Sequence, residues 1–356
     1  MRRTGLFTLY GVTIAAVIAA VLLSIGGGRA RTDPRVNRPV LTGLAQRLDQ
    51  VARLTVVHGD LKTTLLREHG VWEVEQKDDY PADAAKIRHI LLGLAALRYA
   101  EPKTAKPDLY SRLDVEDAGK KGGDSRLVTL SDATGRLMDE LILGKRRYDI
   151  FGGGNDGIYV RKPSEARSWL ASGSLELPSD TLDWVDRAIT LIPAKRIASA
   201  RFVAPDGTIV AIARAKTGAP FALAGGVPNG HKLKSADALL ELARGLNYFS
   251  LDDVKPATTL PFPARETTRS VYTTFDGLTV TVSMMEHDQM TKDDSGKSTT
   301  TKKYWVKLYA IGTGAAAKKA AALNRRVAAW TYAVPDFKAN TFKTRLGDLL
   351  APEKGS

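Results

Sequence analysis

Apolar and polar residues follow one another along the chain in a pattern that predicts strands paired as hairpins, followed by a helix. Alternating runs at 54–58, 61–67 and 72–75 are typical of half-buried strands. A helix is expected next, with Pro81 at its first position, where a missing N–H costs nothing. Its buried stripe would consist of residues at helical spacing, namely Ile87, Ile90, Leu91, Leu94 and Leu97.

Two later stretches repeat this order. Strands are predicted at 197–203 and 208–214, before a helix that Ser235 would cap. A third pass starts with strands at 271–275 and 278–284, extends through a long hairpin and finishes with an alanine-rich helix. The buried stripe of that last helix would consist of Leu323, Val327 and Trp330.

These passes predict an α+β protein built of repeated hairpin-plus-helix modules, with antiparallel sheets covered on one face by helices. A meander with strands at 126–130 and 137–143 belongs to the first module. The three modules are expected at 54–195, 196–265 and 266–352, and the last of them contains the long polar hairpin.

The N-terminal region predicts a membrane anchor. Residues 6–25 carry no charge, and a helix of that length, at ~1.5 Å per residue, crosses a ~30 Å hydrocarbon core. A cleaved secretory signal is the alternative, although the apolar run is longer than usual for one. We expect 1–5 to be a cytoplasmic tail, 26–53 a basic linker, and the bulk of the chain to be periplasmic, at a bacterial inner membrane crossed once. The linker would end in a docking helix with Leu41, Leu44, Leu48 and Val51 on one face.

The amino-acid composition limits the kinds of functional site that the chain can form. The chain has no cysteine, which excludes disulfides, thiolate zinc sites and iron–sulfur clusters. Its formal net charge is +13, and the arginine-rich residues 1–38 supply five of these units. The remaining positive excess suits contact with anionic lipids or polyanions, but charges of both signs are interspersed, as on an ordinary solvated surface.

Two glycine motifs suggest nucleotide binding, and both lack the flanking elements that it requires. The run Ser-Gly-Lys-Ser-Thr at 295–299 has no glycine five residues before its Gly-Lys pair, and the pattern after it indicates a strand where a phosphate-binding loop needs a helix. The run Gly-Gly-Gly-Asn-Asp-Gly at 152–157 is also followed by a strand pattern. Both runs are therefore interpreted as hairpin turns.

Residues able to bind metals or transfer protons are scattered. Glu286, His287 and Asp288 form the densest group, but they are expected in a water-exposed hairpin. Residues 302–307 mix lysines with aromatics, yet no nucleic-acid binding is expected. We predict no catalytic, cofactor-binding or metal-binding residue and no cofactor, although groups distant in sequence could still meet in the fold. None of the histidines has a second ligand at zinc spacing: His58, His69, His89, His231 and His287.

Several runs, distributed over nearly the whole chain after residue 25, carry a resemblance to a known family: Gly70-Val-Trp-Glu-Val74, Tyr80-Pro-Ala-Asp-Ala-Ala-Lys-Ile87, Glu101-Pro-Lys-Thr104, Leu109-Tyr-Ser-Arg-Leu-Asp-Val115, Gly157-Ile-Tyr-Val-Arg161, Ser168-Trp-Leu-Ala-Ser172, Trp184-Val-Asp-Arg187, Thr274-Phe-Asp-Gly-Leu278 and Trp330-Thr-Tyr-Ala-Val-Pro335. These runs resemble the bacterial domain-of-unknown-function 4340 family. The resemblance implies an N-terminally anchored envelope protein, in a family whose genes often lie beside those of a gliding-motility-type ABC transporter. It implies no site residues. The chain departs from the family at 112–115, where glycine is common, and in the length of its hairpin at 288–303.

Three functional hypotheses remain open. The first is a non-catalytic extracytoplasmic accessory subunit, anchored in the inner membrane, that contacts the permease or ATPase of an ABC-type transporter through sheet edges. The second is a module that binds an envelope polyanion, such as lipid headgroups or a cell-wall polymer. The third is a hydrolase whose site is assembled from distant residues.

Overall fold

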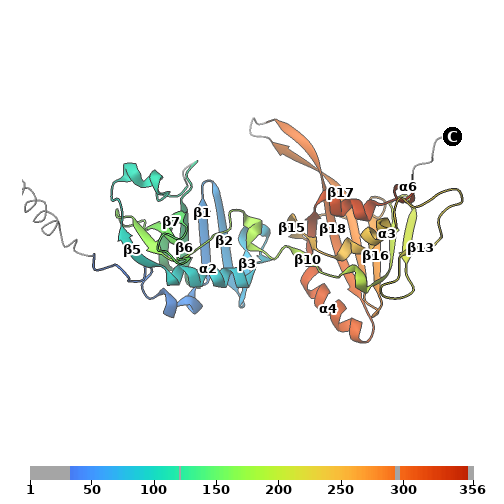
Figure 1. Cartoon of the computed structure of the whole chain (residues 1–356), viewed down its shortest axis with the longest axis horizontal. Coiled ribbons are helices and arrows are strands. Elements are labelled where there is room, and N and C mark those ends of the chain that lie inside the picture. The colour runs from blue at the N-terminus through green and yellow to red at the C-terminus, as the bar shows by residue number, and fades with distance from the viewer. Residues whose placement is uncertain (1–32, 120–121, 293–296, 352–356) are drawn as a thin grey trace, which may run out of the picture. The chain divides into compact units, whose positions relative to one another are not determined.

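The computed structural model describes residues 33–119, 122–292 and 297–351, and their regular secondary structure is mainly β-strand (Figure 1). By compactness the chain divides into two units, and the division falls within strand β2 (Leu61–Glu68). The first unit holds the described residues up to 64 together with 85–177, and the second holds 65–84 and the described residues from 178 onward.

A nine-stranded sheet has the order β4-β3-β2-β1-β6-β7-β8-β9-β5, and its hairpins are antiparallel. Helix α2 (Ala84–Ala96) buries Ile87, Ile90, Leu91 and Leu94, as the apolar spacing predicts. The prediction that Pro81 occupies the first position of this helix is wrong, because the helix begins at Ala84 and Pro81 pairs with Glu73 in the sheet. The remaining strands are β1 (Arg53–His58), β3 (Val71–Val74), β4 (Tyr80–Pro81), β5 (Arg98–Pro102), β6 (Arg126–Ser131), β7 (Leu137–Arg147), β8 (Gly157–Arg161) and β9 (Trp169–Ser172).

An eight-stranded sheet in the second unit has the order β13-β12-β11-β16-β17-β18-β19-β15. Helix α3 (Ala236–Ala243) packs against β11, α4 (Ala315–Val327) against β18, and α5 (Asp336–Lys343) against β16. A short helix α6 (Leu346–Leu349) follows, and β10 (Ala188–Thr190) pairs with β14 (Phe249–Ser250) separately. The strands of the large sheet are β11 (Ile197–Val203), β12 (Ile209–Ala213), β13 (Ala222–Leu223), β15 (Asp253–Pro256), β16 (Thr268–Thr274), β17 (Thr279–Lys292), β18 (Ser298–Ile311) and β19 (Trp330–Val334).

The predicted α+β class with repeated modules is wrong, because the described chain consists mostly of antiparallel sheets with few helices. The hairpins themselves are where the pattern places them, and β11 spans the predicted residues. The second and third hairpins pair with each other through β11 and β16, for example at Ala200 and Tyr272. When the edge strands of two hairpins pair in this way, they satisfy each other's backbone hydrogen bonds. The two hairpins therefore form one continuous sheet in place of two separate sheets.

The predicted span at 6–25 and the tail at 1–5 lie outside the described residues. Within the described ranges, no helix has both the length and the apolar character to cross a membrane.

Two local helix predictions also fail. In place of the docking helix, two short 3₁₀ turns (Leu44–Gln46 and Leu48–Gln50) place Leu44 in the core, and the left-handed backbone of Gly43 precedes them. Trp330 opens strand β19 and does not continue the helix that ends at Val327. The N-cap prediction is confirmed, because Ser235 Oγ accepts a hydrogen bond from the Ala238 amide at 3.1 Å.

Candidate functional site

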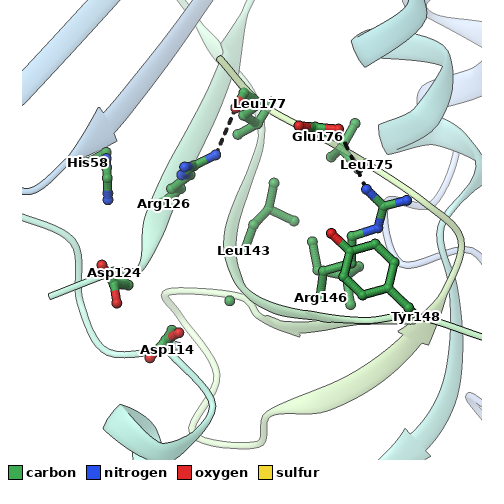
Figure 2. A pocket seen from close by; sticks show the side chains of 12 residues that line it. His58, Asp114, Asp124, Arg126, Leu143, Arg146, Tyr148, Leu175, Glu176 and Leu177 are labelled. Atoms are coloured by element: carbon green, nitrogen blue, oxygen red, sulfur yellow. Dashed lines mark hydrogen bonds and ion pairs between the residues drawn. The ribbon is translucent and has the colours of Figure 1, made fainter. Parts of the chain in front are cut away.

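A polar pocket of about 340 Å³ opens in the first unit (Figure 2). Its walls combine charged groups of both signs, one histidine, one tyrosine and several aliphatic side chains. The volume falls within the range of small-molecule sites. The lining residues are His58, Asp114, Asp124, Arg126, Leu143, Gly144, Arg146, Tyr148, Ile158, Leu175, Glu176 and Leu177.

Strand pairing positions one wall of the pocket. His58 at the end of β1 lies directly opposite Arg126 at the start of β6. Directly opposed residues of an antiparallel pair project on the same face of the sheet. Arg126 Nη1 donates a hydrogen bond to the carbonyl oxygen of Leu177 at 2.8 Å, which holds the guanidinium at the pocket wall.

A tight backbone contact positions the floor. A Cβ on Gly144 would lie 2.1 Å from the Leu113 carbonyl oxygen, so only glycine admits this approach of the 113–115 loop to β7. The Lys145 amide donates to the same carbonyl at 3.0 Å. Lys145 Nζ lies 3.2 Å from a carboxylate oxygen of Asp114, whose backbone is left-handed. Asp114 thus reaches the pocket already paired.

Arg146 organises the opposite wall. Its Nε and Nη2 contact Asp156 Oδ2 at 3.1 and 2.5 Å, and its Nη1 lies 3.6 Å from Glu176. The guanidinium also stacks 4.5 Å from the centre of the Tyr148 ring. The pKa of Asp156 is lowered, mainly by the hydrogen bond from the Asp149 amide and then by the bond from Arg146. Asp156 is therefore a charged partner that keeps Arg146 in place.

A second feature, in the second unit, is a two-stranded ribbon, defined as residues 286–292 of β17 and 298–303 of β18 (Figure 1). Pairing of β17 with β16 ends at Met284, and pairing of β18 with β19 begins at Tyr304. Among the described residues, no other strand pairs with the ribbon. Its side chains at 286–290 and 298–302 are exposed, and Met290 is 75% exposed.

Ion pairs hold the base of the ribbon. Lys302 lies 2.5 Å from Glu286, and it is the main reason that the pKa of Glu286 is lowered. Lys303 Nζ lies 2.9 Å from Asp253 on β15. Next to them, Met285 and Trp305 lie in a buried cluster. The ribbon thus begins where the core ends.

The structure confirms the hairpin interpretation of both glycine motifs. Strand β18 begins at Ser298, directly after the Gly-Lys pair, and β8 begins at Gly157. Of the sequence candidates, His58 lines the pocket, while Glu286, His287 and Asp288 lie on the ribbon. No group of three metal-ligating side chains is found within the described ranges.

Sequence reasoning did not bring His58 together with Arg126, Arg146 or Tyr148. His58 and Arg126 meet through the pairing of β1 with β6, and these two strands are far apart in the chain. Hydrophobic periodicity predicts that a strand exists and which face it buries, but it does not identify the strand beside it. A useful signal was the β6–β7 meander, because it would place Arg126 and Leu143 opposite each other.

A family model described as "Domain of unknown function (DUF4340)" matches residues 72–266, more than half of the chain. A search of curated proteins found none that matches this chain. Many of the runs that carry the resemblance contribute to packing. Tyr110, Val115, Tyr159 and Leu170 form one buried cluster, and Trp184 is 1% exposed.

Proposed function

The chain belongs to the DUF4340 family, and we propose that it acts as an accessory subunit that binds a protein of an ABC-type transport system through the ribbon. The observation that carries this proposal is that no other strand in the described part of the chain pairs with the two edges of the ribbon, which begin beyond Met284 on β17 and before Tyr304 on β18. Its place of action would be the extracytoplasmic side of a bacterial inner membrane.

The edges offer backbone groups to a partner. Each exposed edge carries a row of N–H and C=O groups, which is the template for adding a strand from another chain. The ribbon extends about 20 Å from Glu286 to Lys292, at about 3.3 Å per residue. Natural proteins usually cover or shorten such edges, so a long uncovered ribbon favours a role in association.

The composition of the ribbon favours a protein partner over a polyanion. Lys302 and Lys303 are each paired with a carboxylate, Glu286 and Asp253 respectively. Their charges are locally compensated, so electrostatic attraction to phosphate or sulfate groups is weak here. The uncharged Thr299, Thr300 and Thr301 occupy much of the second strand, which is typical of residues that pair well in sheets.

Photo-crosslinking in cells tests the proposal. A benzoylphenylalanine at Met290 on the ribbon is compared with one at Tyr248, which is 76% exposed in the same unit but lies outside the ribbon. We expect crosslinks from position 290 to the extracytoplasmic part of a transporter permease, and no crosslinks to this protein from position 248. Equal crosslinking from both positions, or crosslinks from position 290 to lipid alone, contradicts the proposal.

A shortened ribbon provides a second readout. Replacing 289–301 by Asn-Gly joins Asp288 to Lys302, which face each other, through a two-residue hairpin loop. The ion pairs of Lys302 and Lys303 remain available. We expect this variant to fold and to lose co-purification of the transporter protein. Undiminished co-purification from a folded variant overturns the assignment of the ribbon as the binding element.

A further inference from the structure

We propose that the pocket of the first unit binds a neutral sugar ring with free hydroxyl groups. This inference is independent of the proposed function, because the pocket and the ribbon share no residue. Three properties of the pocket carry it: balanced charges, polar groups held in place by the fold, and an exposed aromatic ring at the rim.

The mixture of charges in the lining disfavours a ligand that carries a strong charge of one sign. Two arginines and three carboxylates line the pocket, and several are paired: Arg146 contacts Asp156 and Glu176, and Asp114 contacts Lys145. A phosphate would meet the carboxylates of Asp114 and Asp124, and an ammonium would meet the guanidinium groups. A ligand without formal charge avoids both repulsions.

Hydroxyl groups match this mixture of donors and acceptors. Each hydroxyl donates one hydrogen bond and accepts others, so it can bond to a guanidinium and to a carboxylate alike. Bonds to ionised partners are stronger than bonds between neutral groups. The bond from Arg126 to Leu177 and the contact between Arg146 and Asp156 hold these planar groups before a ligand arrives. Preorganised groups lose little conformational entropy on binding.

Tyr148 supplies an apolar surface. The Arg146 guanidinium lies 4.5 Å from the centre of its ring, and Figure 2 shows the two side chains next to each other. Tyr148 is nevertheless 74% exposed. A sugar ring presents C–H groups on one face, and these pack on an aromatic ring while the hydroxyls reach polar partners.

Saturation-transfer NMR on the full chain tests the inference, with maltotriose and N,N′-diacetylchitobiose as soluble probes. Insoluble amylose and chitin distinguish a polymer from a free saccharide, and triglycine tests for a peptide instead. We expect transfer from the protein to ring protons of at least one sugar. Tyr148→Ala should weaken binding about tenfold, because it removes the stacking surface. Tyr148→Phe should retain sugar binding, because it keeps the aromatic ring.

The control is Tyr248→Ala, which removes an equally exposed tyrosine from the second unit. It should leave the sugar signals unchanged. Since Tyr148 is largely exposed, its replacement should not unfold the protein, and far-UV circular dichroism checks this. Absence of signal for both sugars, binding of triglycine in their place, or unchanged sugar binding by Tyr148→Ala overturns the inference.

Discussion

Arg161 Nε donates a hydrogen bond to the carbonyl oxygen of Val115 at 2.8 Å, and the arginine is only 4% exposed. The same guanidinium contacts the Asp117 carboxylate and lies 4.5 Å from the centre of the Tyr110 ring. A buried charge requires partners of this kind, because desolvation of an unpaired guanidinium is costly. Arg161, which ends one of the family runs, therefore secures the 113–117 loop that forms the pocket floor.

Replacing this arginine should destabilise the first unit. Arg161→Ala removes the donor to Val115, so a buried carbonyl is left without its partner, and the packing against Tyr110 is lost. We expect the free energy of unfolding to fall by about 3 kcal/mol. Urea unfolding followed by tryptophan fluorescence measures it.

Arg136→Ala is the matched control, since Arg136 also pairs with an aspartate but has a side chain 79% exposed. Arg136→Ala should lower the free energy of unfolding by less than about 1 kcal/mol. Equal losses from the two variants would contradict the role given to Arg161.

Gly144→Ala should displace the pocket floor. A Cβ at this position would lie 2.1 Å from the Leu113 oxygen and 2.8 Å from the Asp114 oxygen, and both are backbone atoms that cannot rotate away. We expect the free energy of unfolding to fall by about 3 kcal/mol, which is at the upper end of the usual cost of overpacking a core. Gly225→Ala is the control, because nothing lies within 4 Å of its added Cβ. A change at Gly144 as small as that at Gly225 would show that the loop moves freely.

Asp206 should make the second unit sensitive to acid. Hydrogen bonds from the Thr208 amide and then from Arg345 lower the pKa of Asp206 to about 2, below its ordinary value of 3.8. A carboxyl whose pKa is depressed in the folded state stabilises the fold above its unfolded pKa, and this contribution is lost as pH falls from about 4 to about 2.

Urea unfolding at several pH values between 2 and 5 measures this dependence. Asp206→Asn cannot titrate, so its stability should vary less with pH than that of the wild type. Parallel curves for the two proteins would rule out Asp206 as a source of the acid sensitivity.

Hydrogen exchange should divide strand β17 in two. Residues 279–284 pair with β16 on one side and β18 on the other, whereas β18 is the only strand within the described ranges that pairs with 286–292. A two-stranded ribbon without a buried face is only marginally stable in water. We expect amides of the ribbon to exchange at least about a hundredfold faster than those at 279–284. Uniform protection along β17 in the isolated protein would indicate a stabilising contact beyond the pairs described.

The sequence alone determined the local elements: β11 at 197–203, the cap at Ser235 and the long hairpin around the Gly-Lys pair were all predicted. These features depend on neighbours a few residues apart, where turn geometry and periodicity act directly. Only the tertiary structure decided that β11 pairs with β16 and that His58 faces Arg126. Strand edges present the same backbone groups whatever the sequence, so the choice of partner depends on how distant segments pack together.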